Sequence, residues 1–199
     1  MTDRHLDVRF RHLAEALQLV QRGRLPDALK PLRQLNTLQL RDHLTPAWQQ
    51  RLPFLLALAY FQSGDYGKAT LHFERARDRY PELRDYTLWY LGEGLRRLDR
   101  LPSARMAYQW LVDAFPDSVH RPEALFQAAE TNARLGDLQR AAELYTRYQQ
   151  EQPEGAHRGE VLIGLGMVQR DLGNPVAALR DPRRRHHARR LAGRDPAAR

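Results

Sequence analysis

The sequence predicts an all-α fold: an α-solenoid of antiparallel helix pairs over residues 1–179, followed by a disordered, basic, Arg-rich tail at 180–199. Two observations predict it. Three segments, at 56–81, 91–116 and 128–153, align with one another without a gap. Within each of them apolar residues recur at i, i+3, i+4 and i+7, which is the spacing of one face of an α-helix. Units that repeat in this way bury their apolar faces by stacking on their neighbours.

The turn and the second helix of each copy carry the clearest signals. "SGDY" (63–66) and "LGDL" (135–138) predict turns in which Gly takes the left-handed conformation that ends the first helix and Asp caps the second. The second helix has a small residue that allows close approach and an aromatic residue four positions later, and a proline ends it. The alanines are Ala69, Ala104 and Ala141, the aromatic residues Phe73, Tyr108 and Tyr145, and the prolines Pro81, Pro116 and Pro153.

Two less complete copies flank these three. A fourth copy begins at 165–179, with Ala178 at the alanine position. A weaker copy at 17–35 has Ala28 in the corresponding place. The predicted repeat array therefore extends over most of the chain.

The paired helices, with their small, aromatic and proline positions, resemble the tetratricopeptide repeat, whose period is about 34 residues. The resemblance covers residues 53–179 well and 10–40 loosely. It implies a non-catalytic scaffold that binds a protein or peptide partner in the groove of the solenoid.

A second resemblance concerns the joints between copies. "LRDYTLWYLGEG" (83–94), "FPDSVHRPEALFQAAE" (115–130) and "QPEGAHRGEVL" (152–162) resemble the helical N-terminal region of bacterial soluble lytic murein transglycosylases. This resemblance implies a truncated segment of a periplasmic enzyme, associated with peptidoglycan through the parent enzyme. The catalytic Glu-Ser and Gly-Leu-Met-Gln motifs of that family are absent. "GLGMVQ" (164–169) only approximates the second and is expected inside the first helix of the fourth copy.

The alternative is a stand-alone adaptor that binds a partner peptide and contacts anionic partners through its basic tail. The tail carries +6 of the net charge of +8, so the charge predicts no specific nucleic-acid face on the folded part. No apolar run is long enough to span a membrane, and "MTDRHLDVRF" does not predict an export signal. We therefore expect a periplasmic location only if the transglycosylase resemblance holds, and a cytoplasmic one otherwise.

The tail itself leaves three interpretations open. Pro182 falls where the fourth copy should have an aromatic residue, inside a helix, where proline costs about 3 kcal/mol. Residues 180–199 are either an out-of-frame translation, a natural basic tail that binds anionic lipid or nucleic acid, or an inert disordered end. His186 and His187 lack a third metal ligand nearby.

Candidate binding residues follow from equivalent positions on the first helices, which line the concave face of such a solenoid. An aromatic residue is followed four residues later by Glu and eight residues later by Arg. The candidates are Phe54, Trp89, Glu93, Arg97, Phe126, Glu130 and Arg134, with Ile163 at the equivalent site of the fourth copy. The strip could hold an extended peptide or glycan, with Trp89 as its anchor. Alternatively, Glu93 with Arg97 and Glu130 with Arg134 are ordinary i, i+4 pairs on a solvated face. No catalytic, metal or cofactor site is predicted.

Overall fold

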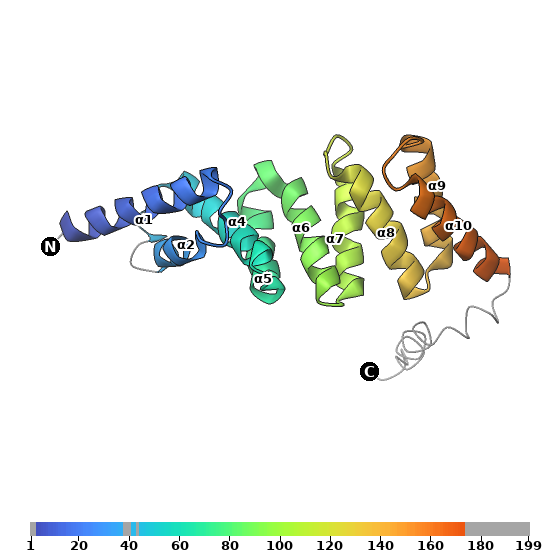
Figure 1. The fold of residues 1–199 in the computed structure, drawn as a ribbon, viewed down its shortest axis with the longest axis horizontal. Coiled ribbons are helices and arrows are strands. Elements are labelled where there is room, and N and C mark those ends of the chain that lie inside the picture. The colour runs from blue at the N-terminus through green and yellow to red at the C-terminus, as the bar shows by residue number, and fades with distance from the viewer. Residues whose placement is uncertain (1–2, 38–40, 43, 174–199) are drawn as a thin grey trace, which may run out of the picture. The chain divides into compact units, whose positions relative to one another are not determined.

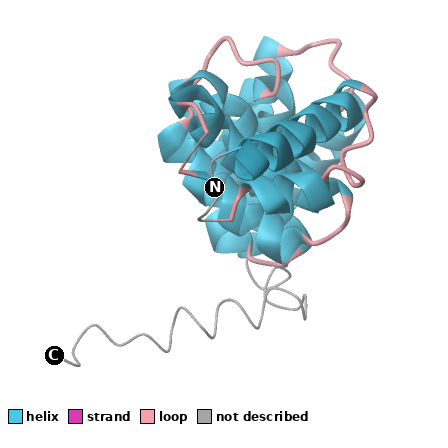
Figure 2. Cartoon of the chain, turned by 90° about the vertical axis from the view of Figure 1, so that its left-hand side faces the viewer, coloured by secondary structure: helices cyan, strands magenta, loops and turns pink. Residues whose placement is uncertain are grey.

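The computed structural model describes residues 3–37, 41–42 and 44–173 of the chain, and within these residues it consists of helices and loops without a strand (Figure 2). The described residues form two compact units, one up to Arg100 and one from Leu101 onward. Ala178, Pro182, the predicted tail and the adjacent histidines lie outside the described residues.

The first unit contains four successive helix contacts that continue along the chain. Helix α1 packs on α2, α2 contacts α4, and α4 packs on α5, which in turn packs on α6 (Figure 1). Their bounds are α1 (Asp3–Gln21), α2 (Leu29–Leu35), α4 (Pro46–Gln62), α5 (Tyr66–Arg79), the 3₁₀ helix η1 (Pro81–Leu83) and α6 (Arg84–Arg97).

Aromatic rings fill the first unit where α4, α5 and α6 meet. Phe73 on α5 is fully buried and stacks on Tyr90 of α6 at 5.7 Å between ring centroids. Phe61 of α4 meets Tyr90 edge to face at 5.3 Å. As predicted, the aromatic residue that follows the buried alanine packs against the helix that begins the next copy, and such ring pairs add to the stabilisation from buried area alone.

The second unit repeats the same order with α7 (Leu101–Ala114), α8 (Arg121–Leu135), α9 (Leu138–Glu151) and α10 (Arg158–Gly173). Each helix packs on the next one along the chain (Figure 1). Tyr145 of α9 is 1% exposed and lies so close to α10 that a Cβ at Gly164 would sit 2.6 Å from its ring. Glycine is therefore required at Gly164 for this approach.

A left-handed residue ends the first helix of each pair, always five residues before a fully buried alanine. The alanines Ala28, Ala69, Ala104 and Ala141 are 0% exposed. The residues five positions earlier are Gly23 (φ +71°), Gly64 (φ +80°), Asp99 (φ +56°) and Gly136 (φ +82°). The weak copy at 17–35 thus has the same turn as the others. The copy at 91–116 makes this turn with Asp99 in place of glycine.

The predicted caps and stops are also confirmed. Asp65 accepts a hydrogen bond from the backbone N–H of Lys68 at 3.1 Å, and Asp137 accepts one from Arg140 at 3.3 Å. Helices α5, α7 and α9 each end two residues before a proline. The residue before a proline is disfavoured in the helical region, so the helix must stop there.

The exceptional turn residue gives a test of this architecture. We expect Asp99→Gly to raise the free energy of unfolding by about 1 kcal/mol, because Gly adopts φ +56° without the Cβ penalty. Gly136→Ala should lower it by about the same amount, since its Cβ meets no neighbouring atom and the cost is purely conformational. Urea unfolding followed by circular dichroism measures both; a destabilised Asp99→Gly would show that the side chain matters more than the backbone.

Candidate protein-interaction surface

In the first unit the predicted residues on α6 lie along one edge of the helix, which we call the α6 edge: Trp89, Glu93 and Arg97. Trp89 is half-buried. The carboxylate of Glu93 accepts two hydrogen bonds from Arg96, at 3.0 and 2.7 Å, in an i, i+3 pair in place of the expected pair with Arg97. The exposed guanidinium of Arg97 lies over the Tyr66 ring, 5.9 Å from its centroid. An aromatic ring, an ion pair and a cation therefore follow one another along a single helix.

Phe54 occupies a different environment although it was predicted as the equivalent of Trp89. Its ring is 6% exposed and meets Phe73 and Tyr80 edge to face, at 6.1 and 6.3 Å. Phe54 therefore belongs to the packing between α4 and α5. Its large apolar side chain is more stable in that interior than on a surface.

In the second unit the equivalent residues on α8 run from buried to exposed. Phe126 is 8% exposed and stacks on His157 with 4.1 Å between ring centroids. Glu130 is half-buried and accepts a hydrogen bond from the hydroxyl of Tyr145 on α9. Burial, and then this hydrogen bond, raises the pKa of Tyr145, so the hydroxyl is neutral and donates. Arg134 is exposed, and so is Ile163 on α10, at 66%.

Two polar clusters at the joints of the second unit were not predicted. In the first, Arg121 at the start of α8 donates hydrogen bonds to Glu151 at the end of α9 and to the carbonyl of Val112. Arg147 also donates to Glu151, at 2.8 Å. The Arg121 hydrogen bonds lower the pKa of Glu151; partial burial opposes this shift and Arg147 reinforces it. The cluster thus joins the start of α8 to the end of α9 through the shared carboxylate of Glu151.

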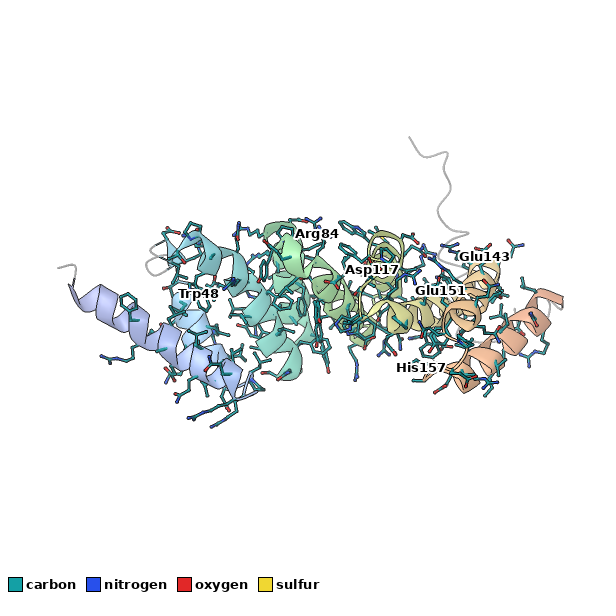
Figure 3. The ribbon with its side chains drawn as sticks, turned by 90° about the horizontal axis from the view of Figure 1, so that it is seen from above. Trp48, Arg84, Asp117, Glu143, Glu151 and His157 are labelled. Atoms are coloured by element: carbon teal, nitrogen blue, oxygen red, sulfur yellow. The ribbon has the colours of Figure 1, made fainter. Side chains whose placement is uncertain are left out.

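The second cluster is centred on His157, just before α10 (Figure 3). Its Nε2 lies 2.5 Å from a carboxylate oxygen of Glu123, and its backbone N–H donates to the Tyr148 hydroxyl at 3.2 Å. Together with the stack on Phe126, these contacts tie the start of α10 to α8 and α9. A signal for this cluster does exist, because "HRPE" at 120–123 recurs as "HRGE" at 157–160.

None of these clusters has the arrangement of a catalytic centre. Among the described residues, no group of three His, Asp or Glu side chains could hold a metal ion. The acidic and basic side chains of both joints are paired with each other across helix ends. "GLGMVQ" lies within α10, as expected for the first helix of a copy. In the same residues no helix is sufficiently long and apolar to cross a membrane.

Comparison with known families decides what the repeated helix pairs are. Residues 54–82 and 91–156 match two family models, each described as a tetratricopeptide repeat. These segments are tetratricopeptide repeats. No curated protein matches the chain. Neither matching model is described as a transglycosylase, so the second resemblance gains no support from this comparison.

Solved structures of tetratricopeptide-repeat type share the fold. MamA AMB-1 superposes with a TM-score of 0.65 at 18% identity and covers 97% of this chain and 94% of its own. MamA from Desulfovibrio magneticus RS-1 gives 0.62 at 15% identity, covering 88% and 97%. Kinesin light chain repeats of Podosopora anserina, described as nearly identical and TPR-like, give 0.59 at 17% identity, covering 98% and 100%. At these identities the likeness establishes the helical-repeat fold alone.

The Glu151 cluster predicts a pH dependence. Because the folded state lowers the pKa of Glu151 from its ordinary 4.5, the stabilisation is complete above that value and is lost as the pH falls through the lowered pKa. We expect Glu151→Gln to lower the free energy of unfolding at neutral pH by on the order of 1 kcal/mol. This deficit should shrink in acid, where the wild-type carboxyl is protonated too. Urea unfolding at neutral and acidic pH measures both effects.

Glu143→Gln is the matched control, because Glu143 lies elsewhere on α9 and pairs only in an exposed contact with Arg140 at 2.8 Å (Figure 3). Exposed pairs of this kind contribute little to stability. Equal destabilisation by both substitutions would show that the cluster at Glu151 has no special role.

Proposed function

We propose that this chain is a tetratricopeptide-repeat adaptor and that it binds an extended segment of a protein partner along the α6 edge. The observation that supports this most directly is the position of Trp89, half-buried on the same helix as the Glu93–Arg96 pair and Arg97. The other predicted phenylalanines are buried in the helix packing, so Trp89 is the large aromatic ring that remains partly accessible among them.

The chemistry of the α6 edge suits a peptide. An indole ring supplies a large, rigid contact area at low entropic cost, and tryptophan is enriched among the residues that dominate binding energy. Arg97 is already positioned over Tyr66, so less side-chain entropy is lost when it meets a carboxylate. Arg96 and Arg97 offer positive charges to the carbonyl groups of an extended backbone.

The adaptor and the transglycosylase segment differ in the number of assumptions that each needs. The adaptor requires only the repeats and an accessible edge. The transglycosylase segment, with its periplasmic location and peptidoglycan association, requires in addition a family relationship that rests on the joint motifs alone. We therefore propose the adaptor.

Peptide selection tests this proposal. Random peptides displayed on phage are selected against the full chain, and the affinities of the enriched peptides are measured by fluorescence anisotropy. We expect Trp89→Ala to weaken binding at least about tenfold, or about 1.4 kcal/mol, because the aromatic anchor is lost. Arg97→Glu, an exposed charge reversal that leaves the helix intact, should weaken binding of peptides with an acidic residue.

Trp110→Ala is the matched control, since Trp110 is 42% exposed but lies on α7, outside the α6 edge. It should leave the affinity unchanged. If Trp89→Ala and Arg97→Glu bind as well as the wild type, or if Trp110→Ala is the weaker binder, the α6 edge is not the binding site.

We also propose that the chain has no hydrolytic or transglycosylase activity of its own. Purified peptidoglycan incubated with the chain should release no soluble fragments, because no group of three His, Asp or Glu side chains among the described residues could hold a metal ion, and Glu151 and Glu123 at the joints are paired with Arg121 and His157. Liquid chromatography of the supernatant measures this. Release of glycan fragments above a boiled-protein control would overturn the assignment as a pure scaffold.

A further inference from the structure

Helix α10 has a stripe with leucine at three of its five positions, and the described helices leave it largely exposed, with Leu165 half-buried. The stripe consists of positions i, i+3, i+4, i+7 and i+10 along one face of the helix. We call it the α10 stripe; its residues are Leu162, Leu165, Gly166, Gln169 and Leu172. Leu162 is 50% exposed and Leu172 is 42% exposed, while Gly166 and Gln169 are also exposed. Large apolar side chains at this exposure are costly unless another surface covers them.

The same stripe is fully covered one copy earlier. A shift of 37 residues places the α10 stripe on five residues of α8: Leu125, Ala128, Ala129, Asn132 and Leu135. All five are buried, with exposures of 0, 0, 0, 1 and 8%. Since α8 and α10 are equivalent helices of successive copies, the exposed stripe marks a surface that is built to be covered.

The occupant of the α8 stripe shows what kind of helix fits. Helix α9 packs on α8 with a small residue, a leucine and two tyrosines at i, i+3, i+4 and i+7, all of them buried. These residues are Ala141, Leu144, Tyr145 and Tyr148. A helix with this face is amphipathic, because its other side carries the charged residues Arg140, Glu143 and Arg147.

The chain's own sequence does not repeat this face 37 residues later. Ala178 corresponds to Ala141, but Asp181, Pro182 and Arg185 stand at the positions of the leucine and the two tyrosines. These residues lie outside the described part of the structure. Aspartate and arginine cannot replace buried apolar side chains without a large desolvation cost, so this segment is a poor candidate for the occupant.

Charge at the edge of the stripe points to a further feature of the occupant. Arg121 is only 13% exposed because it holds Glu151, the last residue of α9. The equivalent Arg158 is 60% exposed and contacts only the nearby Glu154, at 3.2 Å. A carboxylate in the last turn of a docking helix would meet Arg158 as Glu151 meets Arg121.

We propose that the α10 stripe docks an amphipathic helix of a partner protein, with a small residue, leucine and tyrosine on its apolar face and an acidic residue in its last turn. This surface is separate from the α6 edge, and the inference does not depend on what that edge binds. It gives the chain a second mode of recognition, in which a helix is held by its apolar face rather than an extended segment by its polar groups.

A peptide copy of α9 is the probe. A fluorescein-labelled peptide with the sequence of residues 137–155, which contains the complete apolar face and the terminal Glu151, is titrated with the full chain and followed by anisotropy. We expect saturable binding that weakens at least tenfold for the Leu162→Glu chain. Met106→Glu is the matched control, because Met106 is 71% exposed on α7, outside the α10 stripe, and should leave binding unchanged.

A charge exchange locates the binding site at α10. The Glu151→Lys peptide should bind the wild-type chain several-fold more weakly, and the Arg158→Glu chain should restore its affinity. Because the peptide could also displace α9 from α8, rescue by Arg158→Glu distinguishes the two sites. Absence of binding, equal loss with Met106→Glu, or failure of the rescue would each overturn the proposal. So would a dimer in analytical ultracentrifugation that Leu162→Glu abolishes, since the occupant would then be a second copy of the chain.

Discussion

The close contact of an alanine with its neighbouring helix is the constraint on which each helix pair depends. The alanine side chain has no exposed surface in any of the four pairs that include it. The left-handed residue five positions earlier reverses the chain so that this contact can form. In α5 and α9 the aromatic ring four residues after the alanine packs against the next helix along the chain, because Phe73 stacks on Tyr90 and Tyr145 lies against Gly164.

The joints of the second unit show how polar residues serve this packing without forming a reactive site. Arg121 gives its donors to Glu151 and a backbone carbonyl, and His157 is held between Glu123 and the Phe126 ring. The hydrogen bonds of Arg121 satisfy polar atoms that the helix ends would otherwise bury. The charged residues in these joints therefore hold the helix ends in place and are better explained by this role than by catalysis.

The two proposed surfaces differ in kind because they arise from different features of a repeat. The α6 edge offers an aromatic ring and charges to the side of one helix, whereas the α10 stripe offers an apolar face of the type that a helix covers one copy earlier. An adaptor with both could hold two segments at once, which raises the effective concentration of one partner near the other. Two of the joint motifs that resemble a transglycosylase, at 115–130 and 152–162, contain the residues of the His157 cluster.

The sequence by itself determined the helices, their turns, their proline stops and the buried alanines, because these depend on local backbone preferences and on periodicity within one helix. Only the tertiary structure decided that Phe54 and Phe126 are covered, that the Tyr145 hydroxyl meets Glu130, and that Arg121 meets Glu151 thirty residues away. Periodicity shows which face of a helix is apolar, but which neighbour covers that face depends on residues distant in the chain.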